Sequence, residues 1–332
     1  MNYMFSFKKK DIDNQHLPAE TGIYLFKDMD SVLYVGRSAN LQKAIVRLLH
    51  PSQDEKEVFQ LTSLTTDISY QTTDNLFSAL LEEKALLDKY SPKFNKSFKL
   101  HEHYVYLAVD FYHVPFLHLT DSTSENFYYL GPFQKRFFVY DFIDTMADIF
   151  QYPACENETY PCSRLKAKTC SGWCLKDKIE IGKILLDSYM KTNEDLPAKL
   201  KKEIESNEAD LEFTKAEKLK QKLAIIRRYN NYITFFHVTK HINYELSEAG
   251  RTIKLENGMI SEVMEKGKYQ NYPVFNPEYR ENELLAHDKT QFAERWIVYN
   301  HIKKINPGII KDLYNKAQLE FNNIFSGKET KF

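Results

Sequence analysis

One acidic residue of this chain occupies a position where a helical pattern calls for an apolar side chain. Three leucines mark the apolar face of a helix expected from Asn75 to Tyr90: Leu76, Leu80 and Leu87. Glu83 follows Leu80 by three residues and precedes Leu87 by four, so it lies on the same face. A carboxylate among core side chains costs free energy unless a cation neutralises it. The pattern predicts a metal ion or a basic group beside Glu83; the alternative is a residue at the edge of the face whose carboxylate reaches solvent.

The four cysteines form a second group that could do chemistry. All of them lie within one short segment, with the spacing C-x6-C-x7-C-x3-C: Cys155, Cys162, Cys170 and Cys174. In a reducing compartment such a cluster binds metal or acts in catalysis more often than it forms disulfides. Four thiolates can complete a tetrahedral zinc site or hold an iron–sulfur cluster. The paired C-x2-C knuckles typical of zinc are absent, which disfavours zinc without excluding it.

The composition is that of a globular protein with two or three domains. The chain has 332 residues, of which 43% are hydrophobic and 27% charged, and its net charge is -1. Between Ser163 and Arg228, however, 16 basic residues face 11 acidic ones, an excess that favours an acidic partner. Met1 to Lys10 contain no apolar signal segment, and no run of about 18 apolar residues occurs. We therefore expect a cytoplasmic protein with no membrane partner.

The elements around Glu83 are expected to form a small α+β domain, residues 15–98. Two short strands at 22–26 and 32–35 are joined by a polar turn, and a third strand is expected at 67–72. Asn40 caps a helix at 41–49, which Pro51 terminates. The order predicts a three-stranded antiparallel sheet flanked by helices.

The rest of the chain is expected to contain three further regions: a linker and Cys-cluster domain at 99–190, a helical hairpin at 191–230, and a small α+β region of unknown role at 231–332. Strands are predicted at 104–111, 116–119, 232–238, 251–255 and 259–263, the last two joined by a turn at Asn257-Gly258. Helices are predicted at 138–150, in a hairpin over 200–226 broken near Asn207, and at 291–304. The segment 267–288 is expected to be a loop.

Five short motifs occur in order over the first domain: Leu17-Pro18, Gly22-Ile23-Tyr24, Tyr34-Val35-Gly36-Arg37, Ala79-Leu80-Leu81-Glu82-Glu83 and Pro92-Lys93-Phe94-Asn95. This series resembles the GIY-YIG nuclease domain of the excision-repair subunit UvrC and its shorter homologue Cho. The resemblance implies Tyr24 and Tyr34 as active-site tyrosines, Gly36 as a glycine of close approach, Glu83 as the ligand of Mg2+ or Mn2+, and Asn95 as a supporting residue.

Hydrolysis of a phosphodiester needs an activated water and a cation at the developing negative charge. A tyrosine close to a metal and basic groups can lose its proton below its usual pKa of about 10, and Tyr34 is the favoured general base. Tyr24 would then orient water or phosphate, although the sequence does not separate the two roles. Without the motif, either residue would be interpreted as a half-buried strand tyrosine.

Two positions depart from the family. The arginine that contacts the scissile phosphate, and the tyrosine that often follows one turn later, are replaced by Ala44 and Leu48. Arg37 and Arg47 are the candidates to supply the missing positive charge, because Arg47 lies about 60° from Ala44 around the helix and Arg37 follows the second motif. Losing one such donor typically costs a factor of about 10² to 10³ in rate.

The cysteine segment also resembles UvrC. Gly131-Pro132-Phe133, Cys155-Glu156-Asn157, Pro161-Cys162 and Cys170-Ser171-Gly172-Trp173-Cys174 follow the order of its central segment, which holds a [4Fe-4S] cluster in homologues. The resemblance favours a [4Fe-4S] cluster at the four cysteines, with Zn2+ as the alternative and free structural thiols as the third. Arg164, Lys166 and Lys168 would either hold phosphate near the cluster or offset the thiolate charge.

Two further features concern partners. The segment from Leu211 to Leu219 and the helix after it resemble the UVR motif, by which UvrC pairs with the UvrB helicase subunit. The alternative is a hairpin that packs on the protein's own body. Lys93, Lys96 and Lys99 alternate with aromatic residues, as expected either of an edge that contacts DNA or of a solvated charged edge.

Together the resemblances, which cover residues 15–230 with gaps, imply a Cho-like DNA endonuclease that incises the 3′ side of a lesion in nucleotide excision repair. From Asn230 onward no further motif of the family is visible, and we expect no second nuclease domain. Two alternatives stay open: a catalytically weakened DNA-binding or partner-docking repair module, which Ala44 and Leu48 favour, and an iron–sulfur redox-responsive repair factor.

Overall fold

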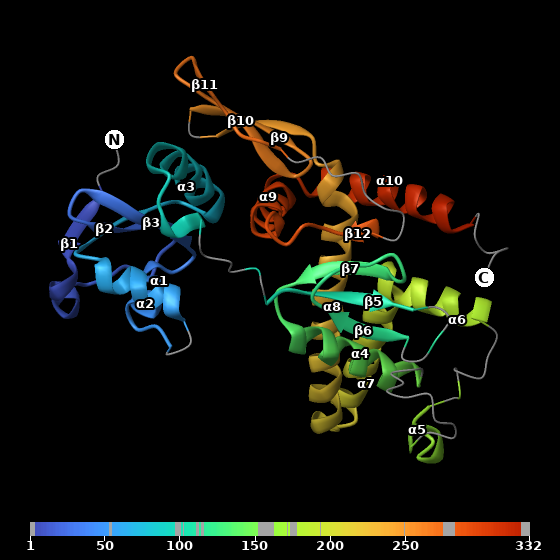
Figure 1. The fold of residues 1–332 in the computed structure, drawn as a ribbon. Coiled ribbons are helices and arrows are strands. Elements are labelled where there is room, and N and C mark those ends of the chain that lie inside the picture. The colour runs from blue at the N-terminus through green and yellow to red at the C-terminus, as the bar shows by residue number, and fades with distance from the viewer. Residues whose placement is uncertain are drawn as a thin grey trace. The chain divides into compact units, whose positions relative to one another are not determined.

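The computed structural model describes residues 4–52, 55–96, 101, 103–110, 113, 116–151, 163–170, 172, 178–192, 194–248, 250–274 and 283–326. The chain divides into two compact units, Met1–Leu100 and His101–Phe332, which are described separately (Figure 1). The finer domain boundaries at 98, 190 and 230 stay predictions. Among the described residues, no helix combines the length and the apolar character needed to cross a membrane.

The first unit is built on an antiparallel sheet with the strand order β1-β4-β2-β3. Its strands are β1 (Phe5–Lys8), β2 (Gly22–Asp28), β3 (Ser31–Ser38) and β4 (Asp67–Thr72). The three predicted strands are confirmed, but the predicted strand number is wrong, because β1 adds a fourth. Four residues are too short a run to show alternation, and β1 is held by its pairing with β4, where Phe5 stacks on Tyr70 with ring centroids 5.5 Å apart.

The helices of the first unit are a 3-10 turn at Lys9–Asn14, α1 (Leu41–Leu49), α2 (Lys56–Leu64), α3 (Leu76–Tyr90) and a 3-10 turn at Phe94–Lys96. The Asn40 side chain caps α1 by accepting a hydrogen bond from the backbone N–H of Lys43, and Asn75 caps α3 through Ser78 in the same way, at 2.9 Å in both cases. The apolar faces of α1 and α2 pack with one face of the sheet into a core that includes Phe26, Ile45 and Leu61. The helices predicted at 41–49 and 75–90 are confirmed, and α2 was not predicted.

The second unit contains two four-stranded sheets. One has the order β12-β7-β5-β6, with β5 (Val105–Val109), β6 (Leu117–Thr120), β7 (Tyr128–Phe133) and β12 (Leu285–Ala286). The other is the meander β11-β10-β9-β8, with β8 (Tyr244–Glu248), β9 (Arg251–Glu256), β10 (Met259–Glu265) and β11 (Lys268–Asn271). The predicted Asn257-Gly258 turn is confirmed, since both residues have positive φ, 50° and 70°. The loop predicted at 267–288 is wrong where β11 and β12 lie.

The helices of the second unit are α4 (Arg136–Phe150), α5 (Ser163–Lys166), α6 (Lys178–Leu185) with a π-helical turn at Leu186–Met190, α7 (Asp195–Ala209), α8 (Phe213–Val238) with a 3-10 turn at Thr239–His241, α9 (Phe292–Ile305) and α10 (Pro307–Ser326). The predicted hairpin is confirmed as α7 and α8, which lie side by side in Figure 1. Its turn lies at 210–212 instead of near Asn207, and Leu211 has a φ of 62° there.

The strand predicted at 232–238 is wrong, because these residues form the last two turns of α8. The segment is rich in aromatic and β-branched residues, which favour strands. In the structure this end of α8 is buried on all sides: Tyr232 stacks on Trp296 with ring centroids 4.9 Å apart, and Phe236 packs edge-on to Phe133 at 5.2 Å. A helix buried on all sides has no apolar face to distinguish it from a buried strand.

Candidate active site

Tyr24 and Tyr34 lie on the same face of neighbouring strands. In the pairing of β2 with β3, Phe26 faces Tyr34 and Tyr24 faces Gly36, and side chains two residues apart on a strand share a face. The two tyrosine rings are both buried, with centroids 6.1 Å apart. A Cβ at position 36 would lie 2.5 Å from Cζ and 2.6 Å from Oη of Tyr24, and 2.9 Å from Cε1 of Tyr34. Gly36 therefore leaves the space that both rings occupy.

The hydroxyls of Tyr24 and Tyr34 are hydrogen-bonded to each other, and each affects the pKa of the other. Burial raises the pKa of Tyr24 well above its usual value, and the charge of Tyr34 and the hydrogen bond to it raise it further. Burial also raises the pKa of Tyr34, but there the hydrogen bond from Tyr24 and the charges of Arg37 and Arg47 act in the opposite direction. Burial therefore disfavours the phenolate of both residues, and the charges of Arg37 and Arg47 favour it in both.

Glu83 lies on the buried side of α3, as predicted, with 8% of its surface exposed. Its Oε2 forms an ion pair with Nη1 of Arg37, on the adjacent strand β3. The predicted basic group is thus Arg37, and the alternative of a carboxylate that reaches solvent is wrong. Because Arg37 also acts on both tyrosines, it connects the acidic and the phenolic parts of the site.

Asn95 holds the strand that carries this group. Its Oδ1 accepts a hydrogen bond from the backbone N–H of Val35 at 2.8 Å, and its Nδ2 donates to the carbonyl of Val35 at 2.7 Å. Val35 lies between Tyr34 and Gly36, so this amide satisfies both backbone groups at the centre of the site. Asn95 is thus a positioning residue for β3.

The positions of Ala44 and Leu48 are apolar in the structure as well as in the sequence. Leu48 is buried in the cluster that contains both tyrosines, and Ala44 is half-buried against it. Arg47 is exposed on α1 and its Nη2 pairs with Oε1 of Glu55 at 2.7 Å. Its charge lowers the pKa of both Tyr24 and Tyr34, so it acts on the same two hydroxyls as Arg37 does, from a different element.

Glu55 was not identified from the sequence. Besides Arg47, its carboxylate accepts hydrogen bonds from the backbone N–H and the hydroxyl of Ser52, each at 3.1 Å. These hydrogen bonds from Ser52 and the Arg47 charge lower the pKa of Glu55. The Arg47–Glu55 pair joins α1 to the residue before α2. A contact of this kind follows no sequence periodicity, so it could not be predicted from the sequence.

The predicted DNA-contacting lysines are only partly described. Lys93 and Lys96 are exposed, and they flank Phe94, which belongs to the tyrosine cluster, and Asn95. The ammonium of Lys93 lies 5.7 Å from the ring centroid of Phe94. Lys99 lies outside the described residues.

The cysteine site is largely outside the described part of the chain, because Cys155, Cys162 and Cys174 fall there. Cys170 is buried and its Sγ accepts a hydrogen bond from the backbone N–H of Gly172 at 3.4 Å. Arg164 is half-buried, and Lys166 and Lys168 are exposed. No group of three or more metal-binding side chains occurs among the residues that are described, so the four-cysteine ligand set stays a prediction.

Comparison with known proteins places these residues in a family. The UvrC-like GIY-YIG domain matches residues 20–96. The UvrABC system protein C of Methanococcus maripaludis is 26% identical over 327 residues, and that of Clostridium beijerinckii is 30% identical over 243 residues. These matches cover 95% and 67% of this chain.

The first unit is thus a GIY-YIG domain. It is of the UvrC type, and the similarity to UvrC proteins extends beyond it into the second unit. Among solved structures, the chain is similar to the magnesium-bound GIY-YIG N-terminal endonuclease domain of UvrC from Thermotoga maritima, with 27% identity and a TM-score of 0.25; the match covers 27% of this chain and 99% of that domain. The chain spans 59% and 38% of the length of the two curated relatives.

Proposed function

We propose that this chain makes a metal-dependent phosphodiester incision in DNA, with Tyr24, Tyr34, Arg37 and Glu83 at the active site. The observation that carries the proposal is the Arg37–Glu83 ion pair beside two coupled tyrosines. Cleavage of a phosphodiester needs an activated water and positive charge at the phosphate, and a buried acid, a guanidinium and two phenols in one place can supply these functions.

The residues of the site fit a divalent cation. Mg2+ commonly binds through one or two carboxylates and keeps waters and substrate phosphates as its other ligands. Glu83 would be that carboxylate, and because its Oε2 is paired with Arg37, a bound Mg2+ or Mn2+ would share Glu83 with the guanidinium or displace it. When bound at Glu83, the cation would stabilise the negative charge that develops on the phosphate.

Within this site Tyr34 is the general base that removes a proton from the attacking water. Tyr24, whose hydroxyl is hydrogen-bonded to that of Tyr34, favours the phenolate of Tyr34 over its own. Arg37 and Arg47 contribute positive charge near the scissile phosphate, in place of the arginine that relatives have at position 44. Gly36 and Asn95 keep the two rings and the strand in place.

We propose that the incision falls on the 3′ side of a lesion in nucleotide excision repair, as the resemblance to UvrC implies. Lys93, Lys96 and Lys99 in the first unit, and Arg164, Lys166 and Lys168 in the second, are the proposed contacts to the DNA backbone. A UvrB-like helicase subunit is the proposed partner of the α7–α8 hairpin, because Leu211 and Phe213 at its turn are 73% and 62% exposed.

A [4Fe-4S] cluster at Cys155, Cys162, Cys170 and Cys174 is the proposed cofactor of the second unit, with Zn2+ as the alternative. The hydrogen bond from the Gly172 N–H to Sγ of Cys170 suits a thiolate ligand, since such donors tune cluster potentials. Anaerobic purification, iron and sulfide analysis and the visible absorbance spectrum test it: stoichiometric zinc with no visible band would reject the cluster.

A nicking assay on lesion-bearing duplex DNA with Mn2+ tests the incision. We expect Glu83→Ala to abolish metal-dependent cutting. Glu57→Ala, which removes an exposed carboxylate from α2 of the same unit, is the matched control and should cut like the unsubstituted protein. Cutting that survives Glu83→Ala would refute the proposed site.

The second candidate function is a DNA-binding or partner-docking module of repair with little nuclease activity. Ala44 and Leu48 favour it, because the helix face where the resemblance to UvrC implies an arginine packs into the apolar cluster here. If the protein is such a binding module, it should bind the same DNA but should not cut it with either Mg2+ or Mn2+.

A further inference from the structure

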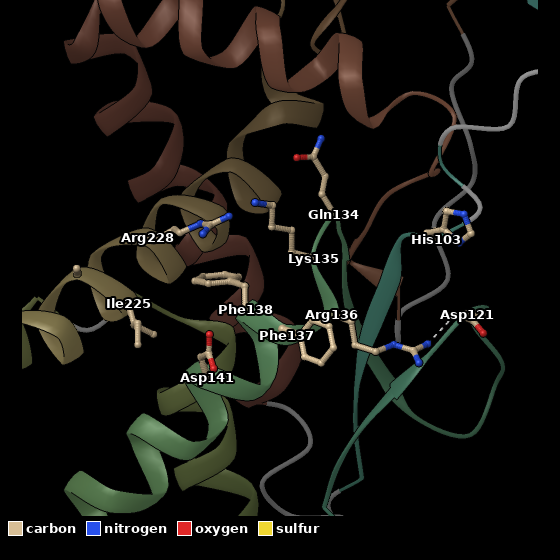
Figure 2. Close-up of a pocket in the computed structure, with 11 residues that line it drawn as sticks. His103, Asp121, Gln134, Lys135, Arg136, Phe137, Phe138, Asp141, Ile225 and Arg228 are labelled. Atoms are coloured by element: carbon tan, nitrogen blue, oxygen red, sulfur yellow. Dashed lines mark hydrogen bonds and ion pairs between the residues drawn. The ribbon is translucent and has the colours of Figure 1, made fainter. Parts of the chain in front are cut away.

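A hollow of about 770 Å³ lies in the second unit, and none of its lining residues belongs to the proposed nuclease site or to the cysteine segment (Figure 2). One wall is the start of α4, with Lys135, Arg136 and Phe137, and another is α8, with Arg228. His103 and Asp121 complete the rim. Basic and aromatic side chains from separate elements thus meet around one open space.

The lining contains three cations, Lys135, Arg136 and Arg228, and two carboxylates, Asp121 and Asp141, so positive charge is in slight excess. Asp121 pairs with Arg136 at 3.4 Å. Among the residues that the structure describes, Asp141 of the lining included, no carboxylate lies within 4.0 Å of the charged nitrogens of Lys135 or Arg228. Lys135 is the N-cap residue of α4, its side chain makes no capping hydrogen bond, and the first turn contains no acidic residue. Cations at the positive end of a helix are unfavourable, and a bound anion would remove that cost.

The aromatic residues of the hollow divide into a buried and an exposed one. Phe138 is buried, and the guanidinium carbon of Arg228 lies 4.2 Å from the centroid of its ring. Phe137 is 80% exposed, the highest fraction among the large apolar side chains described. A single exposed phenylalanine needs no explanation, but one that lines a hollow together with lysine and arginine side chains resembles a surface for stacking a base.

We propose that this hollow binds single-stranded DNA, with one base stacked on Phe137 and the adjacent phosphates contacted by Lys135 and Arg228. The faces of a base are open to a side chain only when the base is unpaired, so the site would prefer single strands to duplex. The inference rests on the proposed function, because it adds a contact in the second unit to the DNA that the first unit would cut.

Fluorescence anisotropy tests the site with the whole chain, without divalent metal so that no cutting occurs. The probes are a labelled single strand of about 12 nucleotides and the duplex of the same sequence. We expect binding of the single strand, but not of the duplex, to depend on the side chains of the hollow. Phe137→Ala should weaken single-strand binding by about 5-fold to 150-fold, since stacking contributes about 1–3 kcal/mol per base. Tyr269→Ala, at an exposed aromatic on β11, is the matched control and should bind normally.

The charge is tested by Lys135→Gln combined with Arg228→Gln. Removing one cation that binds a phosphate should reduce the slope of log affinity against log salt by about 0.7, so the double substitution should reduce it by about 1.4. Lys311→Gln, at an exposed lysine of α10, should leave the slope unchanged. A Phe137→Ala protein that binds the single strand as tightly as the unsubstituted one, or that loses single-strand and duplex binding equally, would overturn the inference.

The two proposals fail separately. Loss of single-strand binding in Phe137→Ala, together with no metal-dependent nicking by the unsubstituted protein, would support the hollow and reject the nuclease. Nicking that depends on Glu83, together with single-strand binding that Phe137→Ala does not change, would reject the site in the hollow and support the nuclease.

Discussion

Arg37 on β3 and Glu83 on α3 form an ion pair in which both side chains are largely buried, at 19% and 11% exposure. The Arg37 guanidinium therefore contacts the same carboxylate that a metal cation bound to Glu83 would contact. Because the same arginine lowers the pKa of Tyr24 and of Tyr34, its position bears on the proposed base as well as on the proposed ligand. Replacing it should thus affect both stability and metal binding.

Arg37→Met should destabilise the first unit by about 3 kcal/mol, because it leaves a buried carboxylate without its partner. Urea unfolding measures this loss. Glu83→Gln combined with Arg37→Met should recover part of it, since the charge is removed as well. Added Mn2+ should stabilise Arg37→Met more than the unsubstituted protein, because Glu83 is then neutralised by metal alone. Equal stabilisation of both proteins by Mn2+ would contradict a metal site at Glu83.

Gly36→Ala should abolish incision, because the new Cβ would lie 2.5 Å from Cζ of Tyr24 and 2.9 Å from Cε1 of Tyr34. The two rings would have to move apart, and their hydrogen bond would break. Single-turnover nicking measures the activity, and circular dichroism confirms folding. Gly182→Ala on α6 is the control: its Cβ meets nothing within 4 Å, so it should keep activity and stabilise the helix by roughly 0.5–1 kcal/mol.

The rate of incision should rise with pH, because the proposed base Tyr34 acts only as the phenolate and burial raises its pKa. The hydrogen bond from Tyr24 lowers that pKa, so Tyr24→Phe should raise it and shift the rising limb of the profile to higher pH. Tyr34→Phe should remove the limb altogether. The measurement is the rate of incision with Mn2+ from neutral to alkaline pH. A shift of the rising limb to lower pH in Tyr24→Phe would contradict the role proposed for Tyr34.

The strands of the site could be predicted from the sequence because short runs of aromatic and β-branched residues lie on either side of a polar turn, as in β2 and β3. The spacing around Glu83 predicted a buried carboxylate and a cation near it, but the identity of that cation depends on how α3 crosses β3, which is a tertiary relationship. The strand β1 and the pair of Arg47 with Glu55 depend on contacts between separate segments in the same way. The end of α8 was misassigned because burial on all sides removes the periodicity on which such predictions depend.

The last prediction concerns the missing arginine. Ala44 is half-buried against the cluster that contains Tyr24 and Tyr34. The resemblance to UvrC implies an arginine that contacts phosphate at this position. Ala44→Arg should therefore raise the single-turnover rate of incision, by up to the factor of about 10² that one such donor contributes. Lys43→Arg, at the exposed neighbouring position on α1, is the matched control and should not change the rate. Arg47→Gln should lower the rate of incision of the unsubstituted protein. It should lower the rate of Ala44→Arg less, because the introduced guanidinium supplies the positive charge that Arg47 otherwise provides. An unchanged rate in Ala44→Arg, with normal folding and Mn2+ binding, would show that phosphate charge does not limit this site.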